Sequence, residues 1–159
     1  MVKKLLIGAV LVVFMASMAF ADNWANGGGQ LLIKAGTNHS ISGGSYLSFG
    51  AELGDRMILL GTLEQWKTGS INVDNGLIGL TVLSDELIKK IHSGVYLTVG
   101  GGIGKTDTSK IDFGTLTDAG LFFNASSKCR LYLGGICSNV SDVTVYAVKF
   151  TVSINASFK

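Results

Sequence analysis

The sequence predicts an all-β fold, an antiparallel up-and-down transmembrane β-barrel of eight strands that follows a cleaved signal peptide. Three observations predict it. An apolar N-terminal segment precedes a chain rich in strand-forming residues, that chain divides into eight runs separated by turn-forming residues, and most of the runs alternate between apolar and polar positions. The 159 residues include 22 Gly and no Pro, a composition that suits strands joined by turns.

The first segment, 1–21, has the organisation of a bacterial signal peptide. Two lysines form a basic start, 5–14 is an unbroken apolar core, and Ala19-Phe-Ala21 places small residues around a cleavage point. The apolar core is shorter than the ~20 residues that a transmembrane helix needs. We therefore expect 1–21 to be removed and 22–159 to form one barrel domain. An N-terminal anchor helix that stays attached is the alternative.

The charge balance argues against one class of partner. Loss of Lys3 and Lys4 reduces the 13 basic residues to 11, which equals the 11 acidic residues. A chain without net positive charge has no electrostatic footprint for nucleic acid. We expect no nucleic-acid partner.

The eight runs are separated by Gly, Asn, Asp and Ser. Strands are expected over 29–37, 44–53, 57–67, 71–83, 92–104, 114–125, 129–138 and 143–158. Brief connections at 54–56, 84–91 and 126–128 alternate with looser ones at 38–43, 68–70, 105–113 and 139–142, an arrangement typical of outer-membrane barrels. The segment 84–91 is expected to be a connector of one or two helical turns, because Ser84 or Asp85 is a good N-cap.

Period-two alternation is clear in five runs. In the last run Tyr146, Val148 and Phe150 share one face, and Lys149 and Thr151 share the other. The third and fourth runs are ambiguous, because 57–60 and 77–83 are apolar on both faces. Both a lipid-exposed barrel and a soluble β-sandwich show such alternation, so a soluble, secreted, ligand-binding barrel is the alternative.

Three further features favour the membrane. The polar faces are rich in Gly and hydroxyl residues, which suit a narrow interior, and the runs reach the ~9–11 residues that a membrane strand needs. Aromatic residues near strand ends or on apolar faces are expected to form girdles at the membrane interfaces. They are Trp24, Tyr46, Trp66, Tyr96, Tyr132, Tyr146 and Phe158.

With these eight alternating runs and a last strand that ends Ile154-Asn-Ala-Ser-Phe158, the chain resembles the small eight-stranded outer-membrane proteins, the OmpX-like barrels and the membrane domain of OmpA-like proteins. The resemblance covers 22–159 and rests on pattern. It implies a location in the outer membrane of a Gram-negative bacterium, contact with outer-membrane lipid, and a terminal aromatic residue that the barrel-assembly machinery reads. Here Lys159 follows Phe158, which departs from that ending. We expect a monomer.

Parity along the strands places six charged residues inside the barrel. The inward set comprises Lys34, Glu52, Glu64, Asp118, Arg130 and Lys149, three of each sign. A turn at 126–128 would set Asn124 opposite Arg130 and Phe122 opposite Tyr132, with Asp118 well above Arg130 along the axis. The interior of an eight-stranded barrel is just wide enough for side chains to fill. The sequence therefore predicts a plugged, polar lumen cross-linked by salt bridges.

The two cysteines, Cys129 and Cys137, fall on one predicted strand. At ~3.4 Å per residue they are roughly 27 Å apart, whereas a disulfide needs Cα atoms within about 7 Å. We expect two free thiols. If Gly134-Gly135 were a hairpin turn, a bridge would be feasible.

Sequence features that suggest chemistry are weak. Val99-Gly-Gly-Gly-Ile-Gly-Lys-Thr106 resembles a P-loop, but Val99 stands where the first Gly belongs and no helix is expected after it. Two His and two Cys make no metal cluster, and no cofactor is expected. His39 with Ser40 or Ser70 and Asp74 is the one catalytic constellation, and we interpret it as loop decoration.

Three functions are compatible with this pattern. The favoured one is a non-enzymatic structural or surface-interaction barrel. The others are a narrow passage for a small apolar molecule, with an opening at the ambiguous third and fourth strands, and a lipid-modifying enzyme built around His39.

Overall fold

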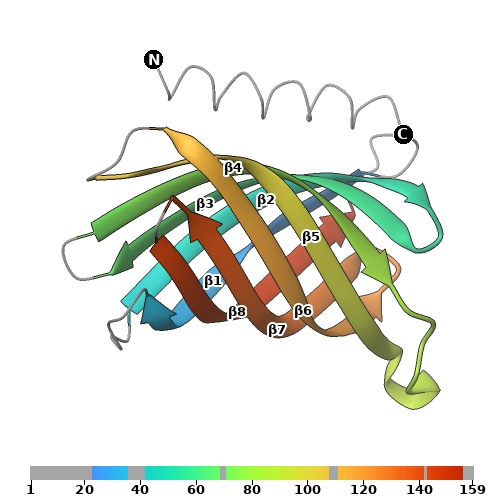
Figure 1. Ribbon diagram of the computed structural model, residues 1–159. Coiled ribbons are helices and arrows are strands. Elements are labelled where there is room, and N and C mark those ends of the chain that lie inside the picture. Colours follow the sequence, from blue (N-terminus) through green and yellow to red (C-terminus); the bar gives the residue numbers. More distant parts are fainter. Residues whose placement is uncertain (1–22, 36–41, 69–70, 108–110, 142, 156–159) are drawn as a thin grey trace.

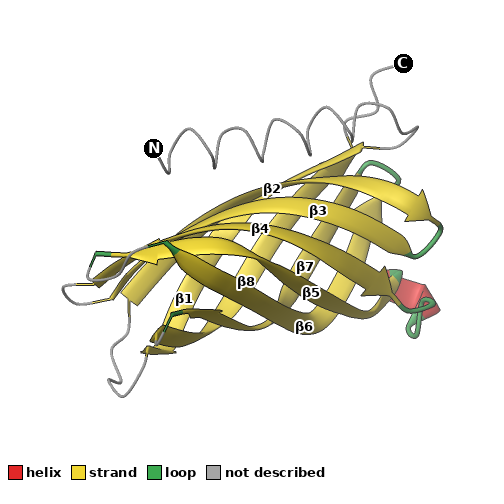
Figure 2. Cartoon of the chain, turned by 45° about the horizontal axis from the view of Figure 1, so that its top comes forward, coloured by secondary structure: helices red, strands yellow, loops and turns green. Residues whose placement is uncertain are grey.

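The computed structural model describes residues 23–35, 42–68, 71–107, 111–141 and 143–155; the expected signal peptide and cleavage point lie outside them. For 23–35 the backbone alone is described. Eight strands form a closed barrel in sequence order (Figures 1 and 2). They are β1 (Asn23–Ala35), β2 (Ser42–Gly54), β3 (Met57–Thr68), β4 (Ile71–Leu83), β5 (Ser93–Thr106), β6 (Asp112–Ser126), β7 (Cys129–Val140) and β8 (Val143–Asn155).

The first and last strands close the barrel. β1 pairs antiparallel with β2 on one side and with β8 on the other, where the register runs from Trp24 opposite Asn155 to Ala35 opposite Val145. Since each strand has a partner on both sides, the sheet has no edge. This satisfies the backbone internally, as a hydrocarbon environment requires. The predicted antiparallel up-and-down barrel of eight strands is confirmed.

Several strands are longer than the sequence pattern indicates. β1 begins at Asn23, not at 29, and contains Gly27-Gly-Gly29, which pattern reading treats as punctuation. β5, β6 and β7 also extend, so the connections expected at 105–113 and 139–142 contract to 107–111 and 141–142. The difference in length between brief and looser connections is therefore smaller than predicted. Pairing on both sides holds such polar and glycine-rich residues in strand conformation although their intrinsic preference is for turns.

The connector between β4 and β5 has less helix than expected. Only Lys89–Ile91 (η1) is helical, of the 3₁₀ type, and His92 ends it in the left-handed conformation. Ile88, the residue before η1, forms an isolated antiparallel β-bridge with Ser93, the first residue of β5. In the described part of the chain, no helix is long and apolar enough to cross a membrane.

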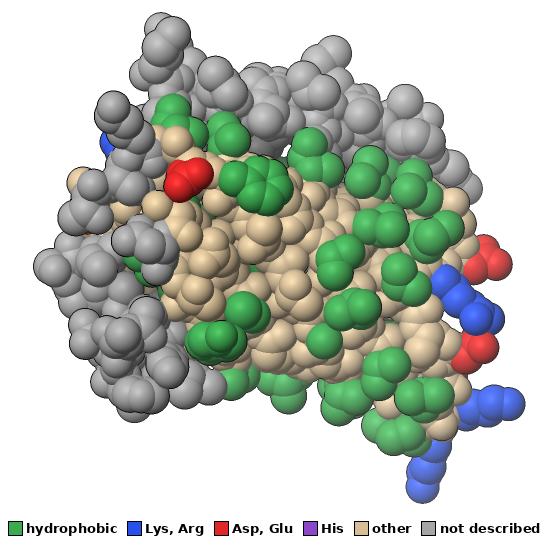
Figure 3. Space-filling view, in the orientation of Figure 1, with side chains coloured by type: hydrophobic (Ala, Val, Ile, Leu, Met, Phe, Trp, Pro, Cys, Tyr) green, Lys and Arg blue, Asp and Glu red, His purple; other side chains and the backbone are tan. Residues whose placement is uncertain are grey.

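The two faces of the sheet differ as the alternation predicts. On β5 and β8 the apolar residues of the predicted outer faces are exposed, apart from the half-buried Val152, whereas Thr98, Lys149 and Thr151 are buried. Figure 3 shows hydrophobic side chains distributed over the barrel wall, and most of the charged side chains visible in this view lie at one end. The structure also assigns the ambiguous strands: Ile58 and Trp66 of β3 and Val73 and Leu77 of β4 point inward.

These inward apolar residues make the lumen less polar than predicted. One buried cluster lies near the connections 69–70 and 141–142 and contains Trp66, Val73, Leu77, Leu116, Ile136, Val140, Val145 and Ala147. A second lies near the turns 55–56 and 127–128 and contains Ile58, Leu83, Tyr96, Phe122 and Tyr132. Both clusters remove apolar surface from water inside a space that side chains already fill.

The hairpin of β6 and β7 confirms the predicted register. Asn124 lies opposite Arg130 and Phe122 opposite Tyr132, although a bulge next to Asn124 shortens the turn to 127–128. Gly134 and Gly135 continue the strand, so Cys129 and Cys137 lie on one strand and both are free, as expected.

Candidate functional site in the barrel lumen

An ion pair between non-adjacent strands stands at the centre of the lumen. Lys149 of β8 forms a salt bridge through Nζ with Asp118 Oδ2 of β6. Asp118 is 1% exposed and Lys149 is 8% exposed. The hydroxyl of Tyr96 donates a 2.7 Å hydrogen bond to Asp118 Oδ1, and the ammonium of Lys149 lies 4.4 Å from the centre of the Tyr46 ring. The carboxylate and the ammonium therefore each have a second partner, as buried charges need.

A glycine on the intervening strand makes room for this cluster. Gly134 of β7 lies opposite Lys149 on one side and opposite Gly120 on the other. A Cβ atom at Gly134 would collide with the hydroxyl of Tyr96. With no side chain here, Lys149 reaches Asp118 across β7, and the Tyr96 hydroxyl reaches Asp118 from β5, the strand next to β6.

Around the ion pair the lumen is filled by small polar side chains. Thr81 and Thr98 share a 2.7 Å hydrogen bond, and Ser48, Thr62 and Thr151 are buried on neighbouring strands. A cavity of about 20 Å³ lies beside the ion pair, and the hydroxyls of Ser48, Thr81, Thr98 and Thr151 are part of its lining. A space of that size holds about one water molecule.

A second polar group lies at the end of the barrel that carries the turns 55–56 and 127–128. Arg130 donates through Nε to Asn124 Oδ1 at 2.8 Å and through a terminal nitrogen to the hydroxyl of Tyr132 at 3.3 Å. Its guanidinium also lies 5.6 Å from the centre of the Phe122 ring. Arg130 is thus held against the aromatic end of the lumen.

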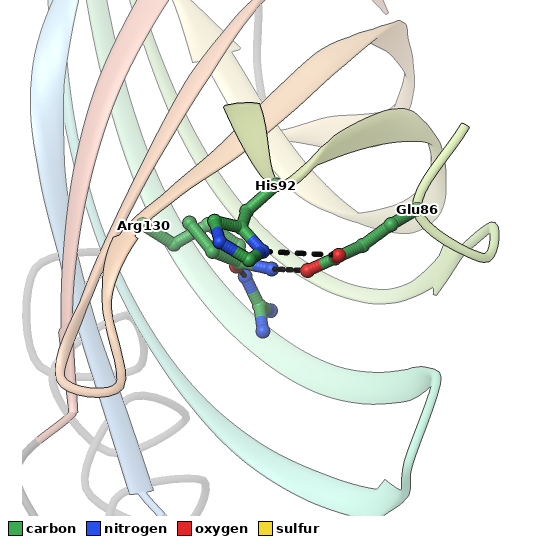
Figure 4. Close-up of polar contacts among 4 residues, drawn as sticks. Glu86, His92 and Arg130 are labelled. Atoms are coloured by element: carbon green, nitrogen blue, oxygen red, sulfur yellow. Dashed lines mark hydrogen bonds and ion pairs between the residues drawn. The ribbon is translucent and has the colours of Figure 1, made fainter. Parts of the chain in front are cut away.

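This group continues into the β4–β5 connector (Figure 4). Asn124 Nδ2 donates to Glu86 Oε1 at 3.3 Å, and His92 Nδ1 lies 3.1 Å from Glu86 Oε2. The hydrogen bonds from His92 and Asn124 lower the pKa of Glu86 below its ordinary value. A hollow of about 430 Å³ opens beside them, between His92, Asn124, Arg130 and 125–127.

The six predicted lumen charges have different environments. Asp118 and Lys149 meet directly, from strands separated by one strand, while Arg130 is bound to Asn124 and Tyr132 nearer the turn. Glu64 is buried on β3 and Glu52 is half-buried on β2. The side chain of Lys34 lies outside the described residues.

Sequence reasoning missed the tyrosines. Tyr46, Tyr96 and Tyr132, together with Trp66, are buried in the lumen and do not form the expected interface girdle, whereas Tyr146 is exposed on the outer face as expected. The side chains of Trp24 and Phe158 lie outside the described residues. The alternation of side chains along each strand could have predicted this burial. Tyr96 lies between the exposed Val95 and Leu97 and therefore shares the inner face with Thr98.

The structure also bears on the remaining motifs. His39, Ser40 and Ser70 lie outside the described residues, while Asp74 is exposed on β4 and accepts a 3.0 Å hydrogen bond from Gln65 Nε2. The P-loop-like segment 99–106 is part of strand β5, so it has no helix N-terminus to hold a phosphate. Among the described residues, no group of three or more His, Cys, Asp or Glu is arranged to hold a metal ion.

Comparison with known proteins supports the fold and gives no sequence relative. No protein-family model matches the chain, and no curated protein matches it. The crystal structure of Ail, the attachment invasion locus protein of Yersinia pestis, superposes with a TM-score of 0.58 at 16% identity and covers 86% of this chain and 99% of that one. Neisserial surface protein A (NspA) superposes with a TM-score of 0.64 at 10% identity, covering 84% and 96%.

At these identities the comparison establishes the fold. A designed transmembrane β-barrel also matches, with a TM-score of 0.50 at 9% identity over 85% of this chain and 97% of the design. The predicted fold class and the resemblance to small outer-membrane barrels are therefore confirmed.

Proposed function

We propose that the mature chain is a plugged outer-membrane barrel with a structural or surface-interaction role, no cofactor and no enzymatic activity. It would sit as a monomer in outer-membrane lipid after insertion by the barrel-assembly machinery. The observation that carries the proposal is the filled lumen. The cavity next to the Lys149–Asp118 ion pair is about 20 Å³, and apolar clusters lie toward both ends of the described lumen.

The position of the charges supports a membrane location. Lys149 is buried inside, whereas its strand neighbours Val148 and Phe150 are exposed on the outer face. A lysine that faced lipid near the midplane would cost ~2–4 kcal/mol. The outer surface of the described strands is thus suited to hydrocarbon, and the charged side chains that the structure describes lie in the lumen or at the ends.

The alternative of a passage for a small apolar molecule has less support. A lateral opening would need a gap between β3 and β4, but these strands pair without interruption from Met57 opposite Val82 to Thr68 opposite Ile71. An axial path would need to pass the Lys149–Asp118 ion pair. Neither route fits a closed barrel with a filled interior.

A surface role would use the end of the barrel opposite η1. There Asp107 accepts hydrogen bonds from the backbone amide and the side-chain amide of Asn72, at 2.9 and 2.6 Å. A polar hollow of about 620 Å³ lies beside them, and Gln65, Lys67 and Asp74 also line it. Two structural neighbours are named an attachment invasion locus protein and a surface protein, which agrees with a surface-interaction role.

The proposal is tested in two steps. We expect the mature protein to begin at Asp22, to resist extraction from membranes by high salt or alkali, and to migrate differently on a gel before and after heating. Protein that passes this step is then placed in planar bilayers, where we expect little steady conductance. Recovery in the soluble periplasmic fraction would overturn the location, and large, reproducible channels would overturn the plug.

A further inference from the structure

The connector 84–92 exposes a group of apolar side chains outside the strands. Leu87, Ile88 and Ile91 are 65%, 54% and 49% exposed, in a segment that includes the single turn of η1. Among the described connections it is the longest. Such a group of aliphatic side chains needs a partner, because a water-exposed apolar patch is unfavourable.

The polar side of the connector is fixed to the barrel. Glu86 accepts from Asn124 and pairs with His92, and Ser84 Oγ accepts a 2.9 Å hydrogen bond from the amide of Val95. The amides of Leu87 and Ile88 donate to the carbonyl of Ser93 at 2.8 and 3.1 Å. These bonds hold the connector in one conformation and leave half or more of the surface of Leu87 and Ile88, and about half that of Ile91, exposed.

The apolar group continues the outer surface of the strands that the connector joins. Val82, at the end of β4, and Val95 and Leu97, at the start of β5, are exposed and apolar. Figure 3 shows hydrophobic side chains next to Lys or Arg side chains at the end of the barrel wall where the connector lies. Lipid that covers the wall at this end is therefore adjacent to the connector.

The charges beside the group match a phospholipid headgroup. Lys89 and Lys90 are exposed within η1, and neither forms an ion pair with any residue in the described ranges. Aliphatic residues directly flanked by lysines are typical of segments that lie in the membrane interface, where the ammonium groups reach the phosphates.

We propose that the 84–92 connector is an interfacial anchor. Leu87, Ile88 and Ile91 enter the boundary between headgroups and acyl chains of the phospholipid leaflet at this end, and Lys89 and Lys90 bind headgroup phosphates. The anchor rests on the proposed function, since it needs a barrel that spans the bilayer. It fixes the depth of that end of the barrel in the leaflet.

Single nitroxide labels in vesicles of phosphatidylcholine and phosphatidylglycerol test the proposal. Cys129→Ser and Cys137→Ser remove the native thiols, and Ile88→Cys, Leu97→Cys or Ser127→Cys then gives one label each. Accessibility to oxygen, which concentrates in lipid, is compared with accessibility to a water-soluble nickel complex. Leu97 is the lipid reference on the barrel wall, and Ser127 is the aqueous reference in the turn at the same end.

The label at position 88 is expected to favour oxygen over nickel, between the two references and nearer to position 97. A label at position 88 that matches position 127, while position 97 reports lipid, overturns the anchor alone. A label at position 97 that reports water overturns the proposed function itself.

A second comparison tests the lysines with position 88 labelled. Lys89→Gln with Lys90→Gln is expected to increase nickel accessibility in vesicles that contain phosphatidylglycerol. Lys67→Gln with Lys105→Gln, at the opposite end of the barrel, is the matched control and should leave it unchanged. Equal nickel accessibility at position 88 in both double variants would overturn the contact between the two lysines and the headgroups.

Discussion

Removing one partner of the buried ion pair should destabilise the barrel far more than removing both. Asp118→Asn removes the carboxylate that pairs with the buried ammonium of Lys149, and Lys149→Met removes the cation from a carboxylate that is 1% exposed and also accepts from Tyr96. Breaking a buried ion pair costs ~3–5 kcal/mol in the free energy of unfolding, whereas replacing both charges is often neutral. We therefore expect each single variant to lose about 3 kcal/mol or more and the double variant to lose much less.

The assay is reversible urea unfolding in phospholipid vesicles of the unaltered protein, the two single variants and the double variant. Unfolding is monitored by tryptophan fluorescence and by heat-dependent gel migration. Arg56→Gln is the matched control, because it breaks the exposed Arg56–Asp85 pair at the barrel end. An exposed pair contributes at most about 1 kcal/mol. The coupling of the buried pair would be refuted if the single variants lost no more unfolding free energy than this control. It would also be refuted if the two losses of unfolding free energy added up in the double variant.

Three other predictions test separate contacts. Gly134→Ala should cost ~1–3 kcal/mol of unfolding free energy because its Cβ would collide with the Tyr96 hydroxyl, whereas Gly135→Ala, with open space around it, should be neutral in the same assay. His39→Ala should leave the lipid composition of the outer membrane unchanged; an altered acylation pattern would support the enzyme alternative. Because the pKa of Glu86 is lowered in the folded protein, its stabilisation should be complete above the ordinary carboxyl pKa and decline as the pH falls through the lowered value. Glu86→Gln should abolish that part of the pH dependence of the unfolding midpoint, and an unchanged profile would contradict the contact.

The sequence by itself determined which residues face lipid on most strands. Side chains alternate along any extended strand, so Lys149 had to lie on the opposite face from Val148 and Phe150 whatever the rest of the barrel did. The turn after β6 likewise determined that Asn124 faces Arg130, because a short hairpin connection sets the register of its two strands. The face of a side chain and the register of a hairpin both depend on neighbouring residues in the sequence, so a local sequence pattern is enough to predict them.

Only the tertiary structure decided how the lumen is filled. β3 and β4 are apolar on both faces, and the closed barrel directs Trp66 and Leu77 inward, where they form a cluster that the sequence left open. The contact of Lys149 with Asp118 depends on barrel diameter, on the stagger of β6, β7 and β8, and on the missing side chain at Gly134. Alternation specifies a face but not the distance across the interior, so these partners follow from closure of the sheet.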